Sequence, residues 1–579
     1  MCDVAISTAG TEKAEIAKPH KSGLAMTEKR RRKMKKRILY IYGGPEFHPT
    51  EWAGKVMTEF LNSDGRFRVD MASDLDAFIS LASGKYDGVV VYTTGFKDGL
   101  TPKREKSLFR FVKNGGGFVG IHSASDSFRE GRAYIEMLNG EFMTHPEHHE
   151  FKLTVTDGSH YVTARMPEFS VFDEMYHLQN YDPSKSRLLF KTTWQGRDMP
   201  MVYARDYGKG RVVYIANGHT AQAWNHPEFR KIVVRAVAYS TGSDLTERTV
   251  RCGLLGYGPA YNMGKNHSTW IDSVPGLKSI AVCDVNPSRV EVARTELPQF
   301  EGYFTNLTDM LKMKGLDLVV NILPHNLHAR TTLQCLKAGK NVVVEKPFCI
   351  NVKEADEMIE TAHSEGVMLS VFHNRRWDAD YLAIRDIIDR GLIGQVFHIE
   401  CGNSGYAHPG FTWRSEKRIS GGIMYDWGGH FIDWILNLVD SKVVKVTGEL
   451  KKLVWNSVTN EDYGRVCMKF ENGVTADYAT STIAAIPGPR WLILGTRGAI
   501  EESSNYEGLR LVSLVSGVRH DGIVKIPDTG LSWTKYYRNI ADHLLMGEEL
   551  TVKPEQSRRV IAVLQACEEN SKRKGNCII

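Results

Sequence analysis

The chain has 579 residues, of which 42% are hydrophobic and 25% are charged. This length predicts several domains, and the composition excludes disordered, collagen-like and coiled-coil proteins. The net charge of +6 arises in residues 1–37, which hold 11 of the 74 basic residues but only four of the 68 acidic ones. We expect residues 1–37 to be a disordered basic tail. Because the remainder is close to neutral, no nucleic-acid partner is expected.

The cysteine pattern and the apolar runs bear on the cellular compartment. No apolar run approaches the length of about 18 residues that a membrane span needs, so no membrane partner is expected. The nine cysteines form no C-x-x-C pair, and none lies in residues 3–251. Such a scatter is typical of a reducing compartment and predicts a cytoplasmic protein.

Strands alternate with helices in residues 38–243, the first expected domain. Such alternation predicts a parallel sheet with helices on both faces. The expected strands are 37–42, 88–93 and 117–122, and the expected helices are 51–62 and 103–114. Small and polar residues at 240–246 then predict a linker.

Two further domains are expected after the linker, and the predicted fold class is α/β. Residues 249–370 repeat the alternation of strands and helices. Residues 371–579 contain longer strands of alternating polarity, which predict an α+β domain with an open, largely antiparallel sheet. The expected strands are 250–255, 279–284, 316–323 and 341–344, followed by 396–402, 443–450, 464–470, 474–481 and 491–495.

A glycine-rich turn follows the first strand of the second domain. Gly256 and Gly258 would let backbone N–H groups approach a pyrophosphate at a helix start. Tyr261 replaces the third glycine of G-x-G-x-x-G, which weakens the motif. Asp284 ends the next strand, where its carboxylate would accept hydrogen bonds from ribose hydroxyls and oppose a 2′-phosphate; a helix N-cap is the alternative. NAD is therefore favoured, and the nearby Arg289 keeps NADP as an alternative.

Later polar motifs complete an ordered set. Glu345 and Lys346 follow a buried strand, and Asp426 and His430 lie four residues apart on one helix face. The set resembles the Gfo/Idh/MocA family of sugar and polyol oxidoreductases from about residue 249 to the C-terminus. The motifs that carry the resemblance are Gly256-Tyr257-Gly258, Asp284, Pro324-His325-Asn326-Leu327-His328, Glu345-Lys346-Pro347 and Asp426-x-Gly428-x-His430.

The resemblance implies a Rossmann domain, an open-sheet substrate domain and a homo-oligomer formed through the open sheet. It also implies that Lys346 lies beside the nicotinamide and that Asp426 and His430 meet the substrate carbinol. The implied cofactor-binding residues are Gly256, Gly258, Asp284, Pro324, His328, Glu345 and Lys346.

Oxidation of a secondary alcohol needs a base for the hydroxyl proton, and histidine titrates near neutral pH. We expect His430 to be the base, Lys346 to stabilise alkoxide charge, and Asp426 to orient the hydroxyls or the imidazole. Asn374 and Arg375 are candidates for holding substrate, with a structural loop as the alternative.

The first domain carries a second resemblance. Gly115-Gly116-Gly117 through Ala124 is similar to the strand-to-helix turn of class I glutamine amidotransferase-like, flavodoxin-like domains. Together with Asp173-Glu174-Met175-Tyr176 and Gly218-His219-Thr220, it resembles the ThuA branch, named for trehalose utilisation. Because His122 stands where the amidotransferases have a nucleophilic cysteine, glutaminase chemistry is excluded.

Four residues of this domain are expected to gather over one end of the sheet: His48, His122, Glu174 and His219. They could perform acid–base work on a sugar or bind a metal, or the histidines could be structural. We assign no metal site. In the run from His145 to Glu150, Pro146 disrupts helical spacing and no tetrahedral ligand set is recognisable.

The sequence thus predicts an NAD(P)-dependent oxidoreductase that acts on a secondary alcohol of a sugar, disaccharide or cyclitol, fused to a ThuA-like carbohydrate-processing domain. A small-molecule carbohydrate is the expected partner. One alternative is a glycosidase of the same family, in which bound NAD transiently oxidises the sugar. Another is a catalytically silent sugar-binding regulator, against which Lys346, Asp426 and His430 count.

Overall fold

The computed structural model describes residues 35–96, 99–243, 249–502, 507–526 and 533–574. Two compact units divide at Ser243, except that Ala164–Pro167 group with the second unit. Most of the predicted tail, residues 1–34, and residues 244–248 of the predicted linker lie outside the described residues. Lys36 and Arg37, which we assigned to the tail, belong to the first strand. Across the described residues, no helix combines the length and apolar character that a membrane crossing requires.

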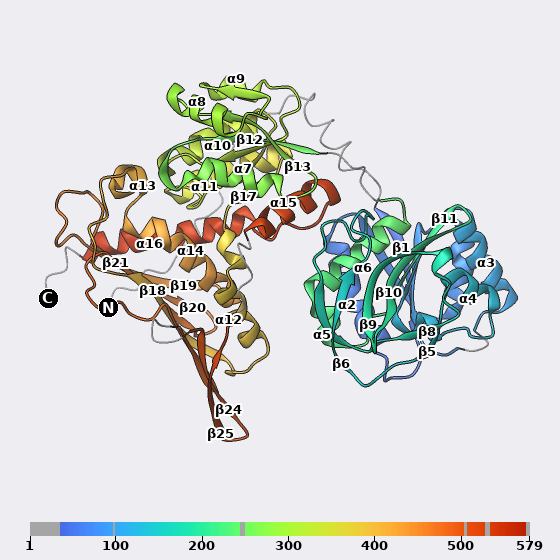
Figure 1. Cartoon of the computed structure of the whole chain (residues 1–579). Helices are drawn as coiled ribbons and strands as arrows, with labels where there is room; N and C mark the ends of the chain where they lie inside the picture. Colours follow the sequence, from blue (N-terminus) through green and yellow to red (C-terminus); the bar gives the residue numbers. More distant parts are fainter. Residues whose placement is uncertain (1–34, 97–98, 244–248, 503–506, 527–532, 575–579) are drawn as a thin grey trace, which may run out of the picture. The chain divides into compact units, whose positions relative to one another are not determined.

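The first unit is built on one nine-stranded sheet with the order β2-β1-β3-β4-β11-β10-β9-β6-β7. Its strands are β1 (Lys36–Gly43), β2 (Phe67–Ala72), β3 (Gly88–Thr93), β4 (Gly117–Ile121), β6 (His149–Val155), β7 (Phe169–Asp173), β9 (Arg187–Trp194), β10 (Arg197–Tyr207) and β11 (Gly210–Ile215). In Figure 1, α2 (Thr50–Ser63), α5 (Ala221–Asn225) and α6 (Pro227–Ser240) cover one face, and α3 (Pro102–Lys113) and α4 (Arg132–Leu138) cover the other.

This sheet is only partly parallel, which the alternation of strands and helices did not predict. Strands β2, β1, β3, β4 and β11 run parallel, whereas β10, β9, β6 and β7 extend the sheet in antiparallel pairs. Within the extension, β9 and β10 are joined by a tight turn of two residues, Gln195 and Gly196. Both residues have a positive φ. That geometry matches the twist of a two-residue hairpin.

The second unit begins with a six-stranded parallel sheet with the order β14-β13-β12-β15-β16-β17. Its strands are β12 (Val250–Leu255), β13 (Leu277–Cys283), β14 (Gly302–Phe304), β15 (Leu318–Asn321), β16 (Asn341–Val344) and β17 (Leu369–Val371). Its helices are α7 (Met263–Asp272), α8 (Pro287–Glu296), α9 (Leu307–Leu311), α10 (His328–Lys337) and α11 (Val352–Glu365). This is the Rossmann strand order, in which ligands bind beyond the carboxyl ends of the strands near the reversal at β12.

An eight-stranded sheet follows, with the order β19-β20-β21-β18-β22-β23-β24-β25. Only β18 and β21 pair in parallel, so the predicted open, largely antiparallel sheet is confirmed. The strands are β18 (Val396–Ser404), β19 (Val443–Lys451), β20 (Tyr463–Phe470), β21 (Thr475–Ser481), β22 (Trp491–Gly495), β23 (Gly498–Glu502), β24 (Leu509–Val515) and β25 (Val518–Val524).

Helices α14 (Ile423–Leu438) and α16 (Pro554–Lys574) pack on this sheet, and α12 (Ala379–Asp389) and α15 (Thr534–Met546) complete the unit (Figure 1). Helix α14 is buried on almost every side, and Trp434 packs against Trp491 of β22 with ring centroids 5.5 Å apart. A polar side chain on α14 is therefore desolvated unless the protein provides a partner for it.

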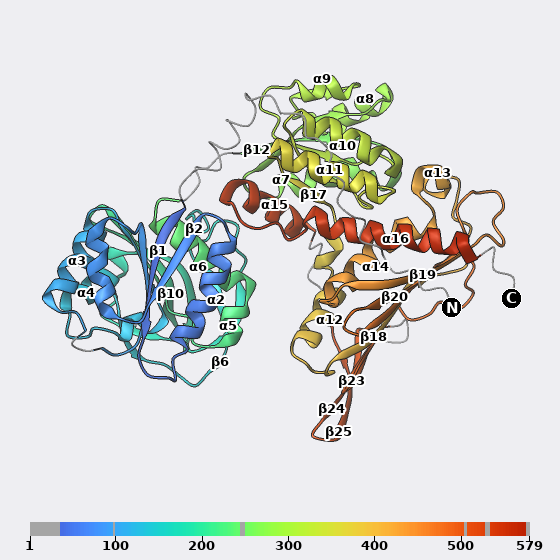
Figure 2. The ribbon, with the colours of Figure 1, turned by 180° about the vertical axis from the view of Figure 1, so that it is seen from behind.

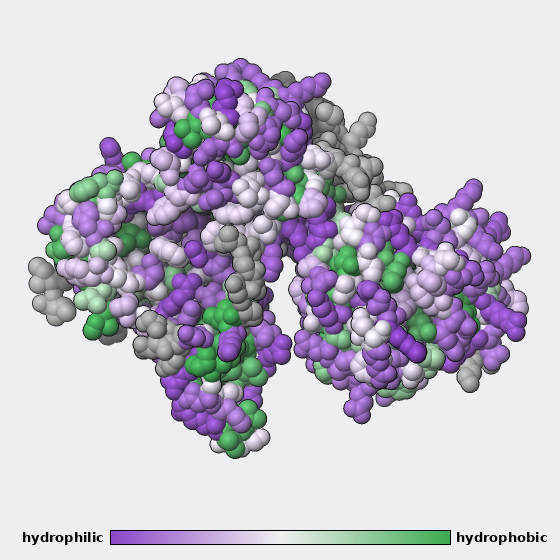
Figure 3. All heavy atoms as spheres, viewed as in Figure 1, coloured by the Kyte–Doolittle hydropathy of each residue, from purple (hydrophilic) through white to green (hydrophobic). Residues whose placement is uncertain are grey.

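The hairpin of β24 and β25 extends beyond the helices in both views (Figures 1 and 2). Four of its apolar side chains are exposed, namely Leu514, Val515, Val518 and Ile523, and Figure 3 shows hydrophobic atoms gathered over this hairpin.

Candidate active site

The turn after β12 leads into α7 with an exposed, glycine-rich backbone. Gly256 has a φ of +108°, a conformation that favours glycine. A Cβ at Gly258 would meet nothing within 4 Å, so that backbone is open to approach. Asn262 precedes α7 without a side-chain capping bond. A helix start whose N–H groups are not capped by a side chain suits an anionic pyrophosphate.

Tyr261 does not supply the close packing that the third glycine of the motif normally provides. It is 73% exposed, and its φ is +57°. Gly264 takes that role instead, because a Cβ there would lie 2.4 Å from the ring of buried Tyr257. Gly264 was visible in the sequence three residues further on, but we gave it no role.

Asp284 joins the tip of β13 to the glycine turn. Its two carboxylate oxygens accept hydrogen bonds from the backbone N–H groups of Tyr257, at 2.7 Å, and Asn286, at 2.9 Å. The N-cap alternative is wrong, because the Asn286 side chain caps α8. Arg289 donates through Nε to the carbonyl oxygen of Tyr257 at 2.7 Å, so an acid and a base both border this turn.

His328 ties two loops together. Its Nδ1 lies 2.8 Å from the carbonyl oxygen of Pro347, and its Nε2 lies 2.7 Å from that of Leu323. Both ring nitrogens therefore face backbone carbonyls, and the ring is completely buried. We accordingly treat His328 as a residue that positions the loop containing Pro324 rather than as one that contacts cofactor.

Glu345 is held by a buried relay. Its Oε1 lies 3.1 Å from Nε2 of His267 on α7, and His267 Nδ1 lies 2.6 Å from the hydroxyl of Tyr537 on α15. The second carboxylate oxygen accepts the backbone N–H of Lys346 at 2.9 Å. Burial raises the pKa of Glu345, but His267 and Lys346 outweigh it, so the pKa lies below its usual value. The relay fixes the backbone from which Lys346 projects.

Lys346 meets Asp426 across the junction of the two sheets. Its Nζ lies 2.7 Å from Oδ1 of Asp426 and 3.2 Å from the backbone oxygen of the same residue. The Lys346 side chain is 17% exposed and that of Asp426 is 36% exposed. Burial raises the pKa of Asp426, but the Lys346 ammonium outweighs burial and lowers the pKa to about 2. The Asp426 carboxyl is therefore ionised at neutral pH, and both side chains of the pair reach solvent.

His430 lies one turn after Asp426 on α14 and is nearly buried. Burial first, and then the positive charges of Lys346 and Arg375, hold the pKa of His430 well below its usual 6.5. Its Nδ1 is buried and has no hydrogen-bond partner among the described residues. A neutral imidazole in this position can accept a proton at neutral pH.

The sequence reasoning missed a third polar position on α14. The Asp433 carboxylate accepts hydrogen bonds from Nε and Nη2 of the buried Arg376, at 2.7 and 2.6 Å. Nδ1 of His373 lies 3.8 Å from Oδ2 of Asp433. The ring centroids of His373 and His430 are 6.4 Å apart. The signal was present in the sequence, because Asp426, His430 and Asp433 follow helical spacing.

The two substrate candidates lie beside α14. Arg375 donates to Oδ2 of Asp378 at 2.8 Å, and its guanidinium carbon lies 4.8 Å from the ring centroid of Trp427. Trp434 donates through Nε1 to the carbonyl oxygen of Arg375, and Asn374 is buried in the same turn. The loop is thus fixed by packing, which any substrate role of Asn374 and Arg375 would use.

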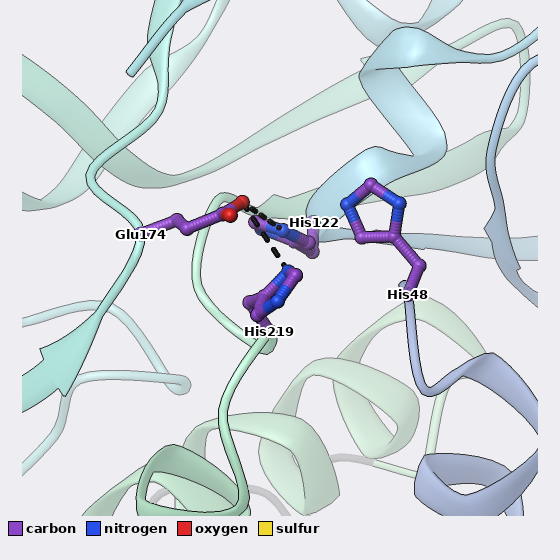
Figure 4. Close-up of side chains that lie close together, drawn as sticks. All are labelled: His48, His122, Glu174 and His219. Carbon is purple, nitrogen blue, oxygen red and sulfur yellow. Dashed lines mark hydrogen bonds and ion pairs between the residues drawn. The ribbon is translucent and has the colours of Figure 1, made fainter. Parts of the chain in front are cut away.

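The four candidates of the first unit do converge. Ligand atoms of His48, His122, Glu174 and His219 all lie within 4.8 Å of one another (Figure 4). The histidines come from the loops after β1, β4 and β11, whose carboxyl ends share one edge of the sheet, and Glu174 follows β7.

Comparisons with known proteins cover both units. A family model described as trehalose utilisation, ThuA, matches residues 37–240. A model described as the oxidoreductase family with an NAD-binding Rossmann fold matches residues 250–373, and the Gfo/Idh/MocA C-terminal domain model matches residues 381–501.

Two relatives and one solved structure illustrate the similarity of the second unit. Scyllo-inositol 2-dehydrogenase (NADP(+)) IolW of Bacillus subtilis is 27% identical over 56% of this chain and 95% of the relative. Uncharacterized oxidoreductase C115.03 of Schizosaccharomyces pombe is 30% identical over 42% of this chain and 70% of the relative. The structure of the oxidoreductase yvaA from Bacillus subtilis matches with a TM-score of 0.51 and 25% identity, covering 57% of this chain and 98% of that one.

Proposed function

Since the chain belongs to the Gfo/Idh/MocA oxidoreductases and carries an N-terminal ThuA domain, we propose that its second unit oxidises a secondary alcohol of a cyclitol or a related sugar. Its class is that of an NAD(P)-dependent dehydrogenase acting on CH–OH groups. The name of the IolW relative makes an inositol the first substrate to test.

The observation that carries the proposal is the Lys346–Asp426 pair with His430 one helical turn away. Lys346 would donate to the carbinol oxygen and stabilise the negative charge that develops on it. His430, neutral and desolvated, would take the hydroxyl proton. Asp426 would hold the Lys346 ammonium in place and accept a hydrogen bond from a neighbouring hydroxyl.

The residues beyond the Rossmann strands suit a dinucleotide. The open backbone at Gly258 and the start of α7 would hold the pyrophosphate, and Asp284 would reach the ribose hydroxyls. When bound, the nicotinamide supplies the hydride acceptor. The protein's own contribution is to align the carbinol between Lys346 and His430 and to move the proton.

The test is a substrate panel with the purified full-length chain. Scyllo-inositol, myo-inositol, aldoses and disaccharides are incubated with NAD⁺ or NADP⁺, with reduced cofactor followed by absorbance and products by mass. Net formation of reduced cofactor together with a keto product supports the dehydrogenase. A cleaved disaccharide without net reduced cofactor supports the glycosidase. Binding without any product supports the regulator.

We also propose that two copies of the chain associate through the open sheet. The β24–β25 hairpin exposes Val515 and Val518, which are 55% and 58% accessible, at its tip. Exposed apolar side chains gathered on one hairpin favour an interface.

A further inference from the structure

The histidine and glutamate cluster of the first unit has an organised interior. His122 is the first residue after β4. Its φ is +46°, an uncommon backbone conformation for a residue other than glycine. Asp173, which is completely buried, accepts the backbone N–H groups of Gly218, His219 and Thr220 at 2.7, 3.1 and 2.9 Å. Asp173 thus holds the backbone that carries His219, and Figure 4 shows His122 and His219 directed at Glu174.

The hydrogen bonds define which ring nitrogens face the centre. His122 Nδ1 lies 2.7 Å from the carbonyl oxygen of Ala216. A carbonyl can only accept, so Nδ1 carries a hydrogen, and the ring presents Nε2 to Glu174, 3.1 Å from Oε2. A metal-binding histidine typically makes the same bond from its second nitrogen to a backbone carbonyl.

His48 follows the same arrangement. The Thr94 hydroxyl donates to Ser123 Oγ at 2.7 Å, so it accepts the hydrogen of His48 Nδ1 at 2.9 Å. The lone pair of His48 Nε2 is then directed away from Thr94, with the Tyr176 hydroxyl 3.2 Å from it. His48 is buried, and its ring lies 5.3 Å from that of His122 and 5.0 Å from that of His219, centroid to centroid.

Glu174 brings a negative charge into this centre. Its Oε2 lies 3.1 Å from His122 Nε2 and 3.3 Å from His219 Nδ1. Two imidazolium rings could satisfy the carboxylate, but their centroids would lie only 5.5 Å apart and their charges would repel. One divalent cation would satisfy the carboxylate and the imidazole lone pairs together.

We propose that the first unit binds one divalent transition-metal ion of the zinc class through His48, His122, Glu174 and His219. Three imidazoles and one carboxylate form a donor set that zinc accepts. With metal–ligand bonds of about 2.0–2.2 Å, tetrahedral ligand atoms lie roughly 3.3 Å apart. Ligand atoms already within 4.8 Å of one another need only small side-chain movements to close on the ion.

Two more histidines mark the solvent side of this site. His148 Nε2 lies 3.1 Å, and His145 Nε2 3.6 Å, from the other oxygen of Glu174. Their side chains are 42% and 35% exposed. They would orient the carboxylate from outside, and they explain why the His145–Glu150 run is rich in histidine without forming a metal site by itself.

The test uses the full-length chain, stripped with a chelator and reloaded with Zn²⁺ or Co²⁺. After removal of excess metal, mass spectrometry of the metal is expected to find one equivalent per chain. The Co²⁺ form is expected to show the visible absorption of a four-coordinate nitrogen and oxygen site without a thiolate charge-transfer band. Less than a tenth of an equivalent, or a thiolate band, would overturn the proposal.

Matched variants locate the ion. Glu174→Gln and His219→Gln are expected to weaken Zn²⁺ binding by more than ~10-fold. His149→Gln, a neighbouring histidine whose Nδ1 faces the carbonyl oxygen of Glu147, is expected to retain it. Wild-type affinity in both cluster variants would overturn the proposal. If a variant does not fold, the Co²⁺ spectrum and the stoichiometry of the wild-type chain decide the question.

Discussion

The ammonium of Lys346 and the carboxylate of Asp426 form an ion pair at 2.7 Å although 80 residues separate them in the chain. Lys346 follows β16 of the Rossmann sheet, and Asp426 lies in the first turn of α14, which packs on the open sheet. Reacting groups supplied by two domains are aligned only when both domains are folded and packed. The pair therefore links the cofactor side of the proposed active site to its substrate side.

Removal of either proposed catalytic group should lower turnover. Lys346→Met deletes the charge and His430→Asn removes the titrating base, so we expect each to reduce kcat by ~10²-fold or more with little change in dinucleotide affinity. Because both act on one oxygen, the double variant should be far less than multiplicatively worse. Lys353→Met, an exposed lysine on α11, is the control. Near-normal turnover in either variant would make that residue structural.

Asp284 should set the cofactor preference. Its charge opposes a 2′-phosphate, so the chain is expected to bind NAD more tightly than NADP, and Asp284→Asn to narrow that difference by ~10-fold. Asn keeps one acceptor for the turn, which limits disruption of the bond to Tyr257. Fluorescence titration measures both affinities, with Asp309→Asn, an exposed acid of the same domain, as the control. Equal affinities in the unaltered chain would remove Asp284 from the ribose site.

The pH dependence should reflect the desolvation of His430. Its pKa lies below the usual 6.5, so the ring remains neutral as the pH falls through that value. Since oxidation needs the neutral ring, kcat/KM should stay flat between about pH 8 and 6.5 and fall only at lower pH. Circular dichroism over the same range checks that the fold persists. An acidic limb centred at or above 6.5 would contradict an active-site base of this kind.

The apolar hairpin should decide the oligomeric state. Val515→Asp combined with Val518→Asp places charges in the proposed interface, so light scattering should show a shift from dimer to monomer. Ile486→Asp, which changes a side chain that is 89% exposed and lies outside the hairpin, should leave the mass unchanged. A monomeric parent chain, or a dimer that survives the double substitution, would place any interface elsewhere.

The sequence by itself determined the features that short windows encode. The period of the strands, the glycine turn after β12 and the helical spacing of Asp426 and His430 depend on neighbours within a few residues. For that reason the Rossmann sheet, the open antiparallel sheet and the families could all be predicted. The predicted strand 88–93, for example, has the same bounds as β3.

Only the tertiary structure decided which distant groups meet. The antiparallel extension of the first sheet depends on which edge β10 joins, and alternation of strands and helices does not encode that choice. The sequence predicted that His328 binds the cofactor, but in the fold both of its ring nitrogens face backbone carbonyl oxygens. The sequence predicted that His48, His122, Glu174 and His219 gather, but only the structure shows that their ligand atoms lie within 4.8 Å of one another. The three histidines follow the parallel strands β1, β4 and β11, and Glu174 follows β7 of the antiparallel extension, so their meeting depends on long-range strand pairing.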